Sequence, residues 1–186
     1  MKSLDIDVRW SAVESAQGKT WTFLNQISPY MRKHFSKPAV YRWCVRQSSK
    51  DVPQCIYIGE AVSLVDRIRR VANPPRQSKP SDTNARLNKI FTDHQSQGLV
   101  VTVEQAAFEE FALNGLVFSP RDMTLFHKFK RCALENLILC SCLGLGDGLL
   151  NLRLEPHKRI EKQLLAAGVE PSIVRKMDVR QVIGAL

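Results

Sequence analysis

The stretch AVYRWCVRQSSKDVPQCIYIGEAVSLVDRIRRV occupies residues 39–71 and decides the fold of the chain. Its first part, residues 39–46, alternates between two sides and is rich in β-branched and aromatic residues, which is typical of a β-strand. The turn sequence SSKDVP follows, and residues 54–59 form a second short apolar run. We therefore predict an antiparallel hairpin that places Tyr41 and Trp43 on one face.

Beyond Gly59 the spacing of the apolar residues changes from the two-residue repeat of a strand to the repeat of a helix. Leucine, valine and isoleucine recur at helical spacing between residues 62 and 71, which predicts a helix over this range. Arg67 borders the apolar stripe of this helix, whereas Arg69 and Arg70 point outward. The helix should end before residues 72–82, where three prolines and no apolar period predict a loop.

Outward from this stretch, the sequence predicts one more strand and several helices. The strand covers residues 99–106, and the helices cover residues 20–26, 83–95, 122–143, 156–166 and 171–183. The result is an α+β fold with a small three-stranded antiparallel sheet flanked by helices. We divide the chain into an N-terminal extension (1–36), a central domain (37–154) and a C-terminal helical segment (155–186).

The composition indicates a polyanionic partner. Lys and Arg number 27 against 18 Asp and Glu, so the net charge is 27 − 18 = +9. Basic side chains that neutralise phosphates release counterions, so nucleic acid is the expected partner, although charge that serves solubility alone is the alternative. No segment approaches the roughly 18 apolar residues of a membrane span, and the first residues lack a secretory apolar region. We expect no membrane partner and a cytoplasmic location, which also suits the odd number of cysteines, five.

Glu135 is an unexpected residue, because it lies within the apolar stretch CALENLILCSCLG at residues 132–144. A partly buried carboxylate is costly unless a cation or hydrogen-bond donors satisfy it. Three interpretations remain open. Glu135 is exposed on a narrow polar seam with Lys128 and Arg131, or it pairs with an arginine, or it binds a divalent metal.

Taken together, these features resemble the GIY-YIG nucleases. The match covers residues 38 to about 152, with YIG literal at Tyr57 to Gly59 and GIY degenerate at residues 39–41. The ordered set is more specific than either short motif, and it consists of Tyr41, Tyr57, Arg67, Glu135 and Asn151. The long linker between the two tyrosines is closer to the restriction-type members than to the compact homing-type ones.

The resemblance implies a role for each member of this set. Glu135 would be the sole protein ligand of one Mg²⁺ (or Mn²⁺), a site that keeps several waters. Arg67 would bind the scissile phosphate, because a guanidinium fork suits two oxygens. Tyr41 would orient or deprotonate the attacking water, Tyr57 would hydrogen-bond the water or the phosphate, and Asn151 would anchor the cleft.

Each residue also has a purely structural interpretation. The two tyrosines would be core aromatics, Arg67 would pair with Asp66 or Glu60, and Asn151 would be a turn residue. Val71 departs from the family pattern, because many members carry a histidine or lysine at that position. Arg70, Lys89 or His94 could take over general acid or base chemistry, and the sequence does not select among them.

The resulting functional prediction is a divalent-metal-dependent endonuclease of duplex DNA, of the restriction type. The basic residues expected to contact DNA are Arg67, Arg69, Arg70, Arg76 and Lys79. A homodimer would suit double-strand cleavage of a palindrome, although the sequence shows no dimer face. The alternatives are a DNA-binding module on a nuclease fold and a nuclease specific for RNA or single strands.

Overall fold

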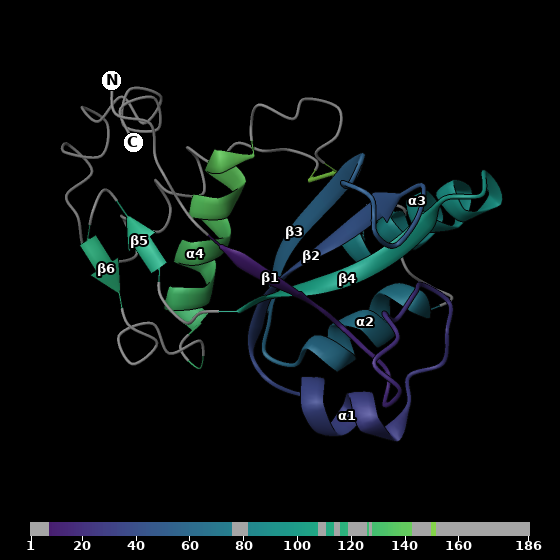
Figure 1. Cartoon of the computed structure of the whole chain (residues 1–186), viewed down its shortest axis with the longest axis horizontal. Helices are drawn as coiled ribbons and strands as arrows, with labels where there is room; N and C mark the ends of the chain where they lie inside the picture. The colour runs from purple at the N-terminus through teal and green to yellow at the C-terminus, as the bar shows by residue number, and fades with distance from the viewer. Residues whose placement is uncertain are drawn as a thin grey trace.

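The computed structural model describes residues 8–75, 82–107, 111–113, 116–118, 126, 128–142 and 150–151. Their helices and strands are shown in Figure 1. In chain order they are β1 (Arg9–Ala12), α1 (Pro29–Phe35), β2 (Ala39–Arg46), β3 (Cys55–Ala61), α2 (Leu64–Ala72), α3 (Thr83–Ser96), β4 (Val100–Ala107), β5 (Phe111–Leu113), β6 (Leu116–Phe118) and α4 (Lys128–Ser141).

The main sheet has four strands in the order β1-β4-β2-β3, and all neighbouring pairs are antiparallel. The predicted β2–β3 hairpin is confirmed, with Tyr41 opposite Gly59 and Trp43 opposite Tyr57. The mixed α and β class is also confirmed, but the predicted number of three strands is wrong. β1 pairs with β4 and adds the fourth strand, and its four residues are too few to show a clear alternation.

Helices cover both faces of this sheet (Figure 1). One core cluster contains Tyr41 and Trp43 of β2 together with residues of α1, α2 and α3, which confirms the predicted face of β2. The other cluster joins alternate residues of β2 and β3 to α4, through Leu134, Ile138 and Leu139. The side chains of β3 are divided in the same way, so Tyr57 faces the first cluster and Ile58 the second.

The segment before β2 differs from its prediction. The helix expected over residues 20–26 is wrong, because the helix begins at Pro29 instead. The Ser28 side chain accepts a hydrogen bond from Met31 N and caps this helix, and proline is favoured in a first turn. Trp21 and Phe23 instead enter the core, where their rings lie edge-on to Trp43 with centroid distances of 6.0 and 5.8 Å.

The remaining helices agree closely with the sequence. Ser63 caps α2 and Asp82 caps α3, and α4 covers Lys128–Ser141 of the helix predicted over residues 122–143, although Phe126 and Cys142 within that range lie in turns. The short strands β5 and β6 form a hairpin between β4 and α4. No helix in the described part of the chain has the length and hydropathy of a membrane span. Arg76, Lys79 and the predicted C-terminal helices lie outside the described residues.

Candidate functional site

The site is organised around the guanidinium group of Arg67, which projects from α2 toward the sheet. Arg67 Nε donates a hydrogen bond to Tyr41 Oη at 2.7 Å, and Arg67 Nη1 donates one to Asn84 Oδ1 on α3. The alternative partners predicted for Arg67 are wrong. Asp66 pairs with Arg69 at 3.0 Å, and Glu60 pairs with Arg131 at 2.8 Å. The guanidinium group of Arg67, which α2 carries, is therefore held between strand β2 and helix α3.

Gly59 provides the space in which the Tyr41 hydroxyl reaches Arg67. The two residues are opposite each other in the β2–β3 register. A Cβ atom at position 59 would lie 2.6 Å from Tyr41 Oη and 3.1 Å from Tyr57 Cε1. The glycine of the YIG triplet therefore lets the Tyr41 side chain lie against the β3 backbone.

We expect Gly59→Ala to lower both stability and any activity of the site. The overlap with Tyr41 would force a shift that costs about 1–3 kcal/mol in free energy of unfolding, as overpacking commonly does, and would displace the acceptor of Arg67 Nε. Thermal unfolding and an activity assay measure the two effects. In Gly59→Ala/Tyr41→Phe the overlap with Oη is gone, but the ring Cζ of residue 41 would still lie 2.8 Å from the new Cβ atom. Only part of the stability should therefore return, and the activity should not. If Gly59→Ala alone left the stability unchanged, this explanation of the role of Gly59 would be wrong.

The two tyrosine hydroxyls are protonated at neutral pH. Burial raises the pKa of Tyr41, the charge of Arg67 opposes the rise, and Tyr57 and Glu135 add to it. Burial also raises the pKa of Tyr57, again opposed by Arg67 and reinforced by Glu135. Tyr41 is 0% exposed and Tyr57 8%. Tyr41 is therefore suited to hold Arg67 in place rather than to remove a proton from water.

Glu135 is buried, with 4% of its surface exposed, so the interpretation that it lies on an exposed polar seam is wrong. Arg131 of that seam is also buried, and it donates hydrogen bonds to the Glu60 carboxylate and to the Phe126 carbonyl. Although α4 packs on the sheet face opposite to the tyrosines, the Glu135 carboxylate is near enough to raise the pKa of both. Pairing with an arginine and metal binding both stay predictions for Glu135.

The carboxylate of Glu135 is the kind of ligand that a hard divalent cation prefers. Mg²⁺ prefers carboxylate and water oxygens and is often held by one or two carboxylates. The described residues contain no group of three or more His, Cys, Asp or Glu side chains arranged for a metal. A cation held by Glu135 would therefore take most of its other ligands from water or from a bound phosphate.

Asn151 fixes the outer edge of β3, the strand that carries Tyr57 and Gly59. Its side chain donates to the Ile58 carbonyl at 2.7 Å and accepts from Ile58 N at 2.8 Å. Leu150 N also donates to the Ile56 carbonyl at 2.7 Å. Residues 150–151 thus cover part of the free edge of β3 and hold Tyr57 in register.

Sequence reasoning missed Asn84 and Arg86, which flank the buried stripe of α3 on two sides. Asn84 faces α2 and binds Arg67, whereas Arg86 Nη1 donates to the Leu150 carbonyl at 3.2 Å. One sequence signal could have identified them as site residues. Both lie near the start of a helix that follows a basic loop. Val71 is fully buried and supplies no cation, and Arg69 and Arg70 are exposed on α2.

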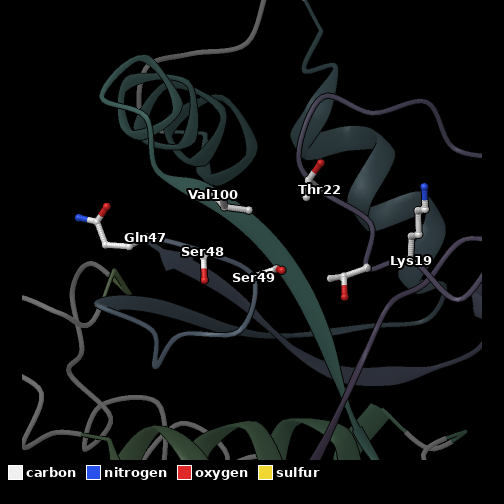
Figure 2. Close-up of a pocket in the computed structure, with 7 residues that line it drawn as sticks. Lys19, Thr22, Gln47, Ser48, Ser49 and Val100 are labelled. Carbon is white, nitrogen blue, oxygen red and sulfur yellow. The ribbon is translucent and has the colours of Figure 1, made fainter.

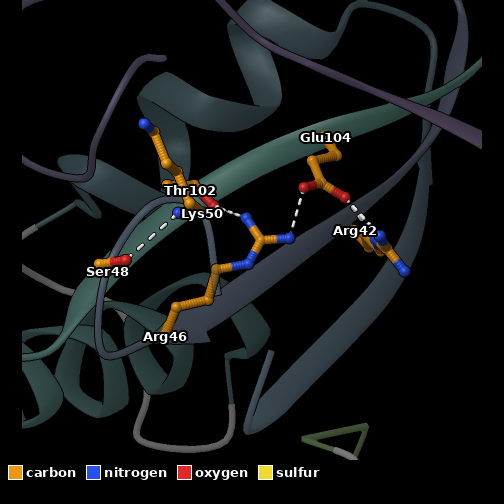
Figure 3. A network of polar contacts seen from close by, with 6 residues as sticks. All are labelled: Arg42, Arg46, Ser48, Lys50, Thr102 and Glu104. Carbon is orange, nitrogen blue, oxygen red and sulfur yellow. Dashed lines mark hydrogen bonds and ion pairs between the residues drawn. The ribbon is translucent and has the colours of Figure 1, made fainter. Parts of the chain in front are cut away.

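Two further polar features lie apart from this site. A cavity of about 530 Å³ is lined by Lys19, Thr20, Thr22, Gln47, Ser48, Ser49 and Val100, none of which is a predicted site residue (Figure 2). A buried network joins Arg42 and Arg46 of β2 to Glu104 and Thr102 of β4 (Figure 3).

No protein-family model, curated protein or solved structure matches this chain. Its function is therefore inferred from the side chains that meet around Arg67. Five residues were predicted as the site, and the described structure shows how Tyr41, Tyr57 and Arg67 meet at the sheet, with Glu135 within electrostatic range.

Proposed function

We propose that this chain is a divalent-metal-dependent endonuclease that hydrolyses phosphodiester bonds of duplex DNA. The observation that carries the proposal is the clamped Arg67, which Tyr41 and Asn84 hold in one orientation beside Tyr57. Nucleases need a fixed cation at the scissile phosphate, because orientation and charge stabilisation supply most of the rate enhancement. The net charge of +9 supports a polyanionic substrate.

Arg67 retains enough donors for a phosphate. A guanidinium carries five N–H groups, and the contacts with Tyr41 and Asn84 use two of them. The remaining N–H groups would bind non-bridging oxygens of the scissile phosphate in a fork. Tyr57, with its hydroxyl protonated, would donate a hydrogen bond to the phosphate or to the attacking water.

Glu135 would hold the divalent cation, Mg²⁺ or Mn²⁺. When bound, the ion supplies Lewis-acid stabilisation of the charge on the phosphate and the leaving oxygen. Burial raises the pKa of Tyr57, which favours its hydroxyl as a hydrogen-bond donor. Tyr41 would act through Arg67 as a positioning residue, because its side chain is fully buried.

The direct test is incubation with plasmid DNA, single-stranded DNA and RNA, each with Mg²⁺ or with EDTA. Cleavage of the plasmid in Mg²⁺ and none in EDTA would support the proposal, and discrete fragments would support its restriction-type form. Duplex binding without cleavage would instead identify a binding module. Cleavage confined to RNA or single strands would contradict the assignment of duplex DNA.

We expect Arg67→Ala to reduce turnover about a hundredfold, the scale seen when one preorganised transition-state donor is removed. DNA binding should weaken by no more than about tenfold, the loss expected for one phosphate contact among many basic residues. Single-turnover cleavage and duplex binding by fluorescence anisotropy separate the two effects. Arg69→Ala on the exposed side of the same helix is the control, and it should weaken binding while saturating DNA restores turnover. Wild-type turnover by Arg67→Ala would refute its assigned contact.

A further inference from the structure

The helix that carries Arg67 offers no second cation to the site. Val71, one turn after Arg67, is fully buried in the core between α2 and the sheet. Arg70 is exposed, and Arg69 is paired with Asp66. Hydrolysis of a phosphodiester develops further negative charge on the phosphate in the transition state, which a second cation beside Arg67 would stabilise.

A second arginine, Arg86, lies on a different helix and next to the strand that carries Tyr57. It belongs to α3, is partly exposed, and donates through Nη1 to the Leu150 carbonyl at 3.2 Å. Leu150 in turn lies on the free edge of β3, two residues along the hydrogen-bond ladder from Ile58. The charges of both Arg67 and Arg86 act on the hydroxyl of Tyr57. The two arginines therefore approach this tyrosine from different helices.

The contact with Leu150 does not account for the charge of Arg86. A carbonyl needs one donor, whereas a guanidinium has five N–H groups and a full positive charge. Among the described residues no carboxylate pairs with Arg86, and the same is true of Arg67. Two partly buried guanidinium groups act on one hydroxyl, and neither forms an ion pair with a described carboxylate, which favours the binding of an anion between them.

We propose that Arg86 is the second phosphate-binding cation of this site and contacts the DNA backbone beside Tyr57. This inference rests on the proposed function and adds to it the side chain that takes the place left by Val71. Arg67 would bind the phosphate from the α2 side and Arg86 from the edge of β3. The ligand class is a phosphodiester of the DNA strand that crosses the site.

The salt dependence of duplex binding tests this contact without any cleavage. Wild-type protein in EDTA and labelled duplex DNA are titrated at several NaCl concentrations, and log Kd is plotted against log salt. Loss of one phosphate contact should lower the slope by about 0.9. We expect Arg86→Gln to show this decrease together with roughly tenfold weaker binding at low salt, and Arg86→Lys, which keeps the charge, to recover the slope.

Lys50→Gln is the matched control, because it removes one positive charge from the exposed turn at the far end of the β2–β3 hairpin. Its slope should equal that of the wild type. Arg86→Gln with an unchanged slope would overturn the inference, whether or not its Tm falls, since a lower Tm alone would indicate only the anchoring of Leu150. Equal decreases of the slope in Arg86→Gln and Lys50→Gln would also overturn the inference, because the decrease would then reflect the loss of any positive charge rather than of a specific phosphate contact.

The outcomes separate the two proposals. If the wild type cleaves duplex DNA and Arg86→Gln cleaves and binds it equally well, the role of Arg86 is rejected and the proposed endonuclease activity is supported. A wild-type protein that neither binds nor cleaves duplex DNA removes both.

Discussion

Glu135→Gln should reduce Mg²⁺-dependent cleavage at least about a thousandfold, because loss of the metal forfeits several kcal/mol of transition-state stabilisation and each 1.36 kcal/mol is a factor of ten in rate. Glutamine has almost the same shape but lacks the negative charge that a divalent cation requires. Single-turnover cleavage with saturating Mg²⁺ measures the effect. Calorimetric titration of the two proteins with Mn²⁺ measures metal binding directly and independently of turnover.

Stability distinguishes a metal ligand from a structural partner at this position. Glu135 is buried at 4% exposure, and burying a carboxylate costs free energy unless it is compensated. If its role is to bind metal, the variant should keep a Tm equal to or above that of the apo wild type. Glu14→Gln, at an exposed position, is the matched control and should retain cleavage. Cleavage by Glu135→Gln at the wild-type rate would remove the metal assignment.

The parts of the fold that the sequence predicted well depend on local patterns. The alternation of residues 39–46 identified both β2 and the face that carries Tyr41, and the helical spacing of residues 62–71 located α2 and the orientation of Arg67. These features follow from the period of a strand or a helix, which neighbouring residues determine. The contact between Tyr41 and Arg67, which are 26 residues apart, was not predicted, although both side chains lie on the faces that the local patterns indicated.

The parts that were missed depend on contacts between distant segments. β1 is a strand because β4 offers a free edge, and the four residues of β1 do not predict this pairing. Asn84 and Arg86 belong to the site because α3 packs beside α2 and the segment at Leu150 returns to β3. A hydrophobic period fixes which side of a helix is buried, but it does not show which polar residue at the border of that side meets another element.

The burial of Tyr41 also changes how its chemistry is understood. The resemblance allowed this tyrosine to orient or to deprotonate water, and the sequence left both roles open. Its side chain is fully buried and accepts a hydrogen bond from Arg67, and burial raises its pKa. A hydroxyl in this environment is a poor base and a good support for a guanidinium, so Tyr57 is the better candidate for contact with the substrate.

A different part of the sheet, the Arg42–Glu104–Arg46 network, should have the largest effect on stability. Glu104 accepts from Arg42 Nε at 2.6 Å and from Arg46 Nη2 at 2.5 Å (Figure 3). Arg42 also lies over the ring of Trp10. The side chains of Arg46 and Glu104 are only 6% and 11% exposed. Neutralising Glu104 would leave two arginines together in a largely buried setting.

We expect Glu104→Gln to lower the free energy of unfolding by about 3–5 kcal/mol, the usual result of breaking a buried ion pair from one side. Urea unfolding followed by circular dichroism measures it. Asp66→Asn makes the same charge change in the exposed pair with Arg69, and it should cost no more than about 1 kcal/mol. Equal losses in the two variants would show that burial does not strengthen the Glu104 network.

The same network predicts how stability depends on pH. Burial opposes ionisation of Glu104, but hydrogen bonds and charges from Arg46 and Arg42 outweigh it and hold the pKa of Glu104 below its ordinary value. A carboxylate whose pKa is lowered by folding stabilises the native state above the unfolded pKa, near 4.3. This contribution disappears as the pH falls through the lower folded pKa. The wild type should therefore lose more stability than Glu104→Gln between about pH 5 and pH 3, and parallel pH profiles of the two proteins would show that Glu104 titrates normally.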